Sequence, residues 1–256
     1  MVRFLLALLF VAIVRAEAQE DSASVAANTE KLRTESGVDP TRVASRLSYS
    51  IIVLDQTGES VEIRNRAKFT LGINRWSFAL RQDLVSLHNG VPGQGFQTGA
   101  GDLSFSILNA FFVSPQHALA ASAEIILPTG AKGITTNYMT MSPQITYSYT
   151  MSPQWIMAIQ PQYTFDLYKD PLYPHVSVLT VRSFIATFLP SGWFFVFEPR
   201  PIYDFTAEQF DLILSPIAGT SLGGGFTLSM LAEFPTRKEL YETRGMWIQA
   251  GLAKTL

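Results

Sequence analysis

The sequence predicts an all-β protein: a transmembrane antiparallel β-barrel of about 12 strands, preceded by a short polar N-terminal arm. Three observations support this fold class, and the first is the segment Trp155–Leu167. Every second side chain there is apolar, whereas the alternate face turns polar after two residues. Since strand side chains alternate between the two faces of a sheet, this segment has one apolar side and one polar side. Its length matches the roughly 9–11 residues that a tilted strand needs to cross a bilayer, and exceeds the roughly 5–6 residues of typical soluble strands.

The second observation is a repeat of this pattern along the chain. Trp193–Phe205 carries the same apolar stripe 38 positions later, and His117–Gly130 carries a similar one 38 positions earlier. Each copy follows a short turn that contains proline. A fixed period indicates repeated supersecondary units, which here consist of two long strands, one tight turn and one longer loop.

The third observation is an exported, apolar chain without a helical span. Arg3, the apolar run Phe4–Val14 and the small-x-small site Ala16–Ala18 predict a signal peptide at residues 1–18. No later stretch has 18 or more consecutive apolar residues, although the chain is 47% hydrophobic and only 16% charged. Such a chain must bury its apolar surface in a core or present it to lipid.

Composition excludes several classes of protein. The chain has no cysteine, so disulfides, thioether-linked haem and thiolate zinc sites are ruled out. The formal net charge of −2 gives no indication of nucleic-acid binding. We expect neither a cofactor nor a metal site, because the three histidines, His88, His117 and His175, are dispersed along the chain.

Residues 19–44 are polar and rich in Ser, Ala, Thr and Glu, which predicts a flexible periplasmic arm with at most a short helix. Entry of this arm into the barrel as a plug is an open alternative. The barrel is expected over residues 45–256. Its twelve strands are predicted near residues 46–54, 61–73, 76–84, 103–112, 117–127, 138–149, 155–167, 175–188, 193–205, 210–218, 226–234 and 246–252. Ten or fourteen strands are open alternatives.

The connections between these strands differ in length. The turns at 74–75, 113–116, 150–154, 189–192 and 219–224 are mostly short, whereas the others, including a glycine-rich loop at Ser86–Gly99, are mostly longer. An even strand number with short periplasmic turns and long outer loops is typical of bacterial outer-membrane barrels. Closure also satisfies every backbone group in lipid, which an open sheet cannot do.

Two motifs carry a family resemblance. Gly99-Ala100-Gly101-Asp102-Leu103 opens one predicted strand, and Leu127-Pro128-Thr129-Gly130 closes the next. Together with the preceding segment Leu71–Trp76, these motifs resemble the outer-membrane transporter-like family labelled "putative meta-pathway of phenol degradation", over roughly Ala67 to the C-terminus. The resemblance implies a barrel of the bacterial outer membrane that passes small molecules, hydrophobic or aromatic ones among them. The chain departs from many outer-membrane barrels in ending with Leu256 instead of Phe or Trp.

Charged residues within the strands are expected to face the lumen, since a charge on a lipid face is costly at mid-bilayer. They are Glu62, Arg64, Arg66, Lys68, Arg81, Asp83, Glu124, Asp166, Arg182, Glu198, Arg200, Asp204 and Glu233. Two interpretations stay open: a constriction that selects permeants, and a network of ion pairs that fills a narrow barrel. The two are compatible.

Aromatic residues near the strand ends predict an interfacial girdle. They are Trp76, Trp155, Trp193, Tyr168 and Tyr203. Arg237, Lys238 and Arg244 lie in a charged loop where they could contact lipopolysaccharide or simply be solvated. The expected partners are outer-membrane lipid and lipopolysaccharide, a small-molecule permeant and the barrel-assembly machinery.

The function that follows is a passive, non-enzymatic outer-membrane pore or transporter for small molecules. Three alternatives remain. A lipid-modifying barrel enzyme would need a nucleophile and base, but no GxSxG motif is present and spacing alone does not exclude a spatial triad. A plugged structural barrel and a soluble, lipocalin-like exported binder are the others.

Overall fold

A computed structural model describes residues 22–55, 60–91, 93–236 and 245–256, and the expected signal peptide (residues 1–18) lies outside this part of the chain. One helix and thirteen strands form in these residues. They are α2 (Ser22–Ser36), β1 (Arg46–Asp55), β2 (Ser60–Ile73), β3 (Trp76–Asn89), β4 (Gln97–Ala100), β5 (Leu103–Val113), β6 (His117–Leu127), β7 (Tyr138–Ser152), β8 (Trp155–Lys169), β9 (Ser177–Phe188), β10 (Trp193–Asp204), β11 (Gln209–Gly223), β12 (Phe226–Pro235) and β13 (Trp247–Thr255).

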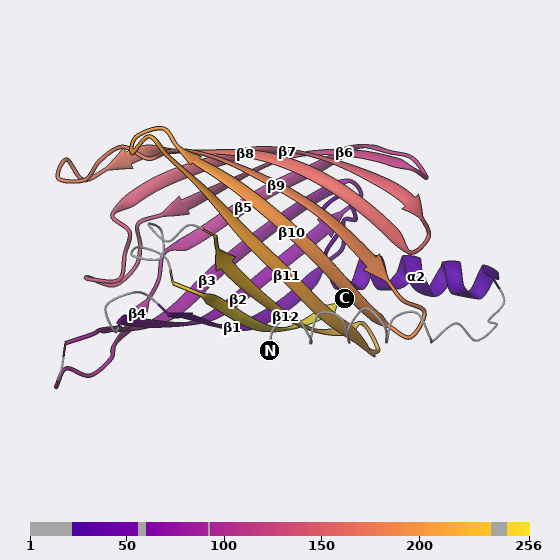
Figure 1. Cartoon of the computed structure of the whole chain (residues 1–256), viewed down its shortest axis with the longest axis horizontal. Helices are drawn as coiled ribbons and strands as arrows, with labels where there is room; N and C mark the ends of the chain where they lie inside the picture. Colours follow the sequence, from indigo (N-terminus) through magenta and orange to yellow (C-terminus); the bar gives the residue numbers. More distant parts are fainter. Residues whose placement is uncertain (1–21, 56–59, 92, 237–244) are drawn as a thin grey trace.

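Twelve of these strands close into an antiparallel barrel, as the sequence predicts. Successive strands pair around the wall, and the β1–β13 pairing, from Arg46↔Thr255 to Leu54↔Trp247, completes the circle. The strands are steeply tilted to the barrel axis (Figure 1). Closure leaves no open sheet edge, which is the condition for a sheet to cross lipid.

The short strand β4 is an addition to this circle. The sequence predicts a long loop over Ser86–Gly99, but β3 continues to Asn89, and β4 folds back to pair with it from Leu84↔Ala100 to Leu87↔Gln97. The prediction of a loop over that whole range is therefore wrong. The cause is that β2 and β3 pair along their full length, up to Ser60↔Asn89, so this hairpin extends beyond its neighbours and exposes an edge that β4 covers.

Apolar side chains of one parity lie on the outer surface of the barrel. On β1, for example, Leu47, Tyr49 and Ile51 are roughly half exposed, whereas Ser50 and Ile52 between and beside them are buried. A continuous apolar exterior is what a lipid solvent requires. Among the described residues, no helix is both long and apolar enough to cross a membrane.

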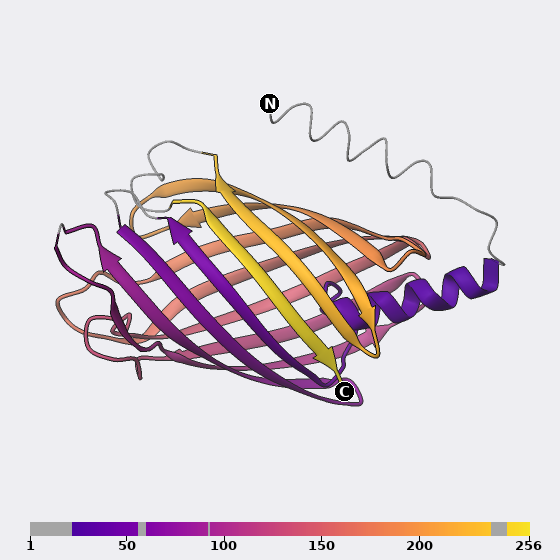
Figure 2. The same cartoon turned by 90° about the horizontal axis from the view of Figure 1, so that it is seen from below.

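The helix α2 lies at the barrel end that carries the short turns and the C-terminus (Figure 2). Seven of its 15 residues are alanine, glutamate, lysine or arginine, which are good helix formers. It ends at Ser36, and Gly37 follows with a φ of 68°, the left-handed conformation that favours glycine after a helix. A side chain at Gly37 would also collide with the guanidinium of Arg46, so this position links the helix end to the start of β1.

Candidate functional site: the barrel lumen and the arm within it

The interior of the barrel is apolar near the short turns. Inward-facing residues of β8, β9 and β10 pack there against Leu32 of α2, which is 3% exposed. The buried members of this cluster are Leu32, Ile156, Ala158, Phe184, Ala186, Phe188, Phe194 and Val196. The arm expected at residues 19–44 thus has its second half inside the barrel, the arrangement that the sequence left open as the plug alternative. Its mobility stays a prediction.

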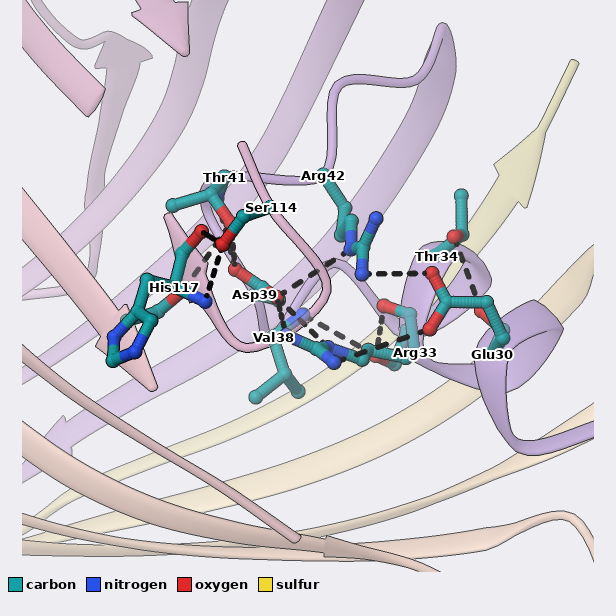
Figure 3. A network of polar contacts seen from close by, with 11 residues as sticks. Glu30, Arg33, Thr34, Val38, Asp39, Thr41, Arg42, Ser114 and His117 are labelled. Atoms are coloured by element: carbon teal, nitrogen blue, oxygen red, sulfur yellow. Dashed lines mark hydrogen bonds and ion pairs between the residues drawn. The ribbon is translucent and has the colours of Figure 1, made fainter. Parts of the chain in front are cut away.

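A polar network fixes the turn that joins α2 to β1 (Figure 3). Asp39 is almost fully buried and accepts hydrogen bonds from Arg33 Nε at 2.8 Å and from the backbone N–H and hydroxyl of Thr41. Arg42 lies on the other side of Asp39 and forms an ion pair with Glu30 at 2.9 Å. Buried carboxylates persist where charged donors satisfy them, so this cluster gives the arm a defined shape inside the lumen.

The arm is also tied to the wall. Arg46 Nη2 donates to the carbonyl oxygen of Thr34 at 2.6 Å, and the hydroxyl of Thr227 on β12 donates to the carbonyl oxygen of Glu35 at 3.3 Å. The hydroxyl of Ser221 on β11 donates to the Glu35 carboxylate at 3.2 Å. The wall residues in these contacts belong to β1 on one side of the β1–β13 closure and to β11 and β12 on the other. The arm therefore bridges the closure and stabilises it.

Beyond the apolar zone, the lumen carries charge. On β9, β10 and β12, Glu198 is 1% exposed and accepts two hydrogen bonds from Arg182, at 2.8 and 2.9 Å. Arg200 donates to Glu198 Oε1 at 2.7 Å and to Glu233 Oε1 at 2.8 Å. Two-point guanidinium–carboxylate contacts are the strong form of this interaction, so four of the predicted lumen residues form one connected group.

This group lies where the backbone pairing of the wall is interrupted. Between β9 and β10, paired positions stop at Ile185↔Phe197 and resume at Thr180↔Ile202. Pro199 and Pro201, which lack N–H donors, fall in this interval. Between β11 and β12, pairing likewise stops at Leu214↔Phe234 and resumes at Ile217↔Leu231, and this interval contains Glu233. The side-chain ion pairs therefore connect strands at places where the backbone does not.

On β2, β3 and β6 the other lumen charges form two further groups. Arg66 donates to both carboxylate oxygens of Asp83 at 2.9 Å, and Arg64 pairs with Glu62. Arg81 contacts Glu124 at 3.1 Å, and Ser104 donates to the same carboxylate oxygen. Here the β2–β3 pairing is continuous from Ser60↔Asn89 to Ile73↔Trp76, so these ion pairs add to an intact ladder.

Three predicted lumen residues lie outside these groups. Asp166 contacts His175 near the loop end of the barrel, and Asp204 accepts backbone N–H bonds from Thr206 and Ala207 in the β10–β11 connection. Lys68 borders a cavity of about 270 Å³ that lies between the arm and the strands β2, β3 and β5–β9. The structure thus divides the predicted set into ion-pair groups, loop-end contacts and one cavity-lining lysine.

Comparisons with known proteins now become informative. A family model described as "Putative MetA-pathway of phenol degradation" matches residues 61–188, half of the chain. The chain belongs to this family. A search of curated protein sequences finds no match.

Solved structures share the fold of this phenol-degradation family member. A COG4313 outer membrane channel from Pseudomonas putida F1 aligns with a TM-score of 0.65 at 11% identity, over 84% of this chain and 96% of the other. The NanC porin aligns with a TM-score of 0.61 at 11% identity, over 83% and 100%. The KdgM porin gives 0.57 at 8% identity, over 82% and 99%. The chain is thus an outer-membrane β-barrel in its fold.

Residues of the two predicted motifs, Gly99–Leu103 and Leu127–Gly130, connect two loops at the loop end of the barrel. This group of contacts around Asp102 is called the loop latch. Asp102 Oδ1 accepts hydrogen bonds from the Gly130 N–H and the Thr135 hydroxyl, and Oδ2 accepts from the N–H and hydroxyl of Thr136, all at 2.7–2.9 Å. Burial raises the pKa of Asp102, but these four hydrogen bonds outweigh it and hold the pKa below its ordinary value.

The neighbouring motif residues are also fixed by hydrogen bonds and by close contacts that leave no room for a side chain at the glycines. The Thr129 hydroxyl accepts from the Leu103 N–H at 3.0 Å, and a side chain at Gly130 would collide with Asp102 Oδ1. At Gly99 and Gly101, a side chain would press against Ala131 and Val85 respectively. Leu127 is the last residue of β6, and Pro128 follows it as the chain leaves the strand. The motif thus joins the β4–β5 corner to the loop at 128–137.

The aromatic residues predicted as a girdle lie on the outer surface. Trp76, Trp155 and Trp193 begin β3, β8 and β10 at the short-turn end, whereas Tyr168 and Tyr203 lie near the loop ends of β8 and β10. All five are among the exposed large side chains, and Trp76 and Trp193 stack on Phe78 and Phe195. The charged loop with Arg237, Lys238 and Arg244 lies outside the described residues.

Sequence reasoning did not single out the arm residues Arg33, Asp39 and Arg42, or Arg46 at the start of β1, which the structure brings to the lumen. The available signal was weak: a turn sequence, Gly37-Val38-Asp39-Pro40, that links a helical segment to the first strand. The three histidines lie apart, and each imidazole hydrogen-bonds to a different partner. These partners are the Gln94 carbonyl for His88, the Tyr147 hydroxyl for His117 and the Asp166 carboxylate for His175. Among the described residues, no cluster of three or more His, Asp or Glu could hold a metal ion.

Proposed function

We propose that this barrel is a passive outer-membrane conduit for small molecules, with the lumen as the path and the arm as its narrowest part. The observation that carries the proposal is the cavity between the arm and the wall, which is polar, charged and enclosed by a barrel with an apolar exterior. The cavity volume of about 270 Å³ limits permeants to small molecules.

The proposal assigns no enzymatic chemistry to the barrel. Supporting this, the three imidazoles contact a loop carbonyl, a tyrosine hydroxyl and a carboxylate at separate places, and none of these contacts pairs a base with a serine or threonine nucleophile. The proposed partners are membrane lipid along the apolar exterior, lipopolysaccharide at the loop end, the assembly machinery during insertion, and the permeant itself.

Single-channel recording in planar bilayers tests the proposal. We expect steady conductance from the refolded mature protein, and a severalfold increase when residues 22–43 are deleted, because the arm then no longer fills the short-turn end. Lys31→Gln is the matched control, since its side chain is 67% exposed on α2 and its change should leave conductance unaltered.

Three outcomes separate the alternatives. Conductance in the deletion variant alone would support the plugged barrel. Silence of both proteins, with the folded barrel verified by its heat-modifiable gel mobility, would refute the conduit. Lipid hydrolysis or acyl transfer that disappears in a His88→Ala, His117→Ala or His175→Ala variant would support an enzyme instead.

A further inference from the structure

The cavity between the arm and the wall has an unbalanced charge. Its charged lining residues are Arg42, Arg46, Lys68 and Arg182, with Asp39 as the one carboxylate among them. That carboxylate is already satisfied, because Arg33, which does not line the cavity, donates to it at 2.6 and 2.8 Å, and Thr41 donates to its other oxygen. Arg42 and Arg182 likewise have acidic partners outside the lining, Glu30 and Glu198. The unpaired positive charge of the cavity therefore comes from Arg46 and Lys68, which form no ion pair among the described residues.

Lys68 contributes a charge that no ion pair with a described residue neutralises. Within the described residues, no acidic group lies within 4 Å of its ammonium nitrogen. Its cross-strand partner on β3 is Arg81, another cation, and its partner on β1 is Ser48. Like charges opposite each other are unfavourable, and the nearby Glu124 is engaged by Arg81 and Ser104. An anion in the cavity would relieve this repulsion.

Arg42 of the arm and Arg46, the first residue of β1, give a second observation, because both line the cavity. The Nε–H of each forms no hydrogen bond among the described residues, although Arg42 Nε lies 3.8 Å from the carboxylate oxygen Oδ2 of Asp39. An unsatisfied buried donor is costly and calls for a missing acceptor. Of the two, only Arg46 Nε has no described acidic group within 4 Å, and together with the unpaired Lys68 it would be satisfied by a bound anion.

The remaining lining residues indicate the chemical character of that anion. The hydroxyls of Ser77, Ser106 and Ser122 offer further polar contacts, as do the amides of Gln144 and Gln160. Val38, Leu108 and Phe184 form an apolar part of the same wall. A site that combines cations, neutral donors and an apolar surface suits a molecule with one charged end and an apolar body.

We propose that this cavity is a binding site for a small monocarboxylate with an apolar body, held at its carboxylate by Lys68 of β2 together with Arg46 of β1 and Arg42 of the arm. The site rests on the conduit function proposed above, since the occupant would be a permeant at the narrowest part of its path. Lys68 is the residue on which the test depends, because it forms no ion pair whose loss would disturb the wall.

Binding is measured by calorimetry on the folded full-length mature protein in detergent, which does not require conduction. The probes are benzoate and its neutral isostere benzamide, with inorganic phosphate as an anion that lacks an apolar body. We expect saturable benzoate binding, weakened at least tenfold by Lys68→Gln and retained within about threefold by Lys68→Arg. Lys31→Gln, which removes the same charge from an exposed helix position, should leave affinity unchanged.

Several outcomes would overturn the site. They are absence of benzoate binding, equal binding in Lys68→Gln, equal binding of benzamide, or phosphate binding as tight as that of benzoate. A conducting protein without benzoate binding would refute the site and leave the conduit intact. A silent barrel that binds benzoate through Lys68 would refute the conduit and leave the site.

Discussion

The wall formed by β1, β2 and β3 is held together differently from the wall formed by β7 to β12. In the first, backbone pairing runs without a break from Arg46↔Thr70 to Asp55↔Val61 and along the whole β2–β3 hairpin. In the second, pairing is interrupted between β7 and β8, between β9 and β10, and between β11 and β12, in intervals that contain Pro143, Pro161, Pro199 and Pro216 among other residues.

Both walls carry buried ion pairs, but only in the second wall do these ion pairs connect strands where backbone pairing is interrupted. Arg66 and Asp83 are directly opposite each other in the continuous hairpin, so the backbone already connects their strands. Arg182 and Glu198 face each other across the β9–β10 interruption, where Ser183 supplies a further link by donating to the Pro199 carbonyl at 3.2 Å. The comparison teaches that lumen charges can replace backbone hydrogen bonds as connectors of strands, apart from any effect on permeants.

Removing one carboxylate from each wall gives the largest expected effect. Glu198→Ala leaves Arg182 and Arg200 without their shared partner in an interrupted region, and should lower the free energy of unfolding by roughly 3–5 kcal/mol, the usual cost of breaking a buried pair. Asp83→Ala breaks a similar two-point contact within an intact ladder, and should cost about 1–3 kcal/mol. Urea unfolding in detergent, followed by tryptophan fluorescence, measures both. Equal losses would remove the distinction between the walls.

Hydrogen exchange examines the backbone itself. Residues 181–184 of β9 have no paired positions on β10, so their amides that point toward β10 lack regular backbone partners. We expect these amides to exchange with solvent at least tenfold faster than the amides at the middle of β2, where pairing is continuous. Peptide-resolved deuterium uptake of the folded barrel in detergent tests this difference. Uniform protection around the barrel would show that the interruptions have no energetic consequence.

The smallest effect is expected at the loop latch, which lies beyond both walls. Because the native pKa of Asp102 is lowered, its contribution to stability is present above the ordinary aspartate pKa of about 3.9 and is lost as the pH falls through the lowered native value. Asp102→Asn should abolish this pH dependence and weaken protection of the Gly130 and Thr136 amides, at a cost of about 1 kcal/mol.

The matched control for the latch is Asp170→Asn in the next loop. Its carboxylate accepts one backbone N–H bond, from Leu172 at 3.0 Å, and makes no link between loops. Local hydrogen exchange in the loop at 128–137, followed from neutral pH to below pH 3, should change in the Asp102 variant alone. Identical pH profiles for the two variants would contradict the assigned role of Asp102.

The amino-acid sequence by itself determined the barrel, a strand number of about twelve, the placement of its short turns and the outward stripe of apolar residues. These features follow from side-chain alternation and turn composition, which are local properties of a strand. The alternation in Trp155–Leu167 predicted the fold, and the segments Leu71–Trp76, Gly99–Leu103 and Leu127–Gly130 together predicted the family whose model matches residues 61–188.

Tertiary structure alone decided which charges meet and what lies in the lumen. Alternation says that Arg200 faces inward, but its contact with Glu233 on a strand two positions away depends on register and barrel curvature. The arm has a polar sequence without a strong apolar stripe, so nothing local indicates that Leu32 packs against Phe188 and Phe194. Strand identity is encoded residue by residue, whereas the cavity around Lys68 exists only once β13 has closed on β1 and the arm lies inside.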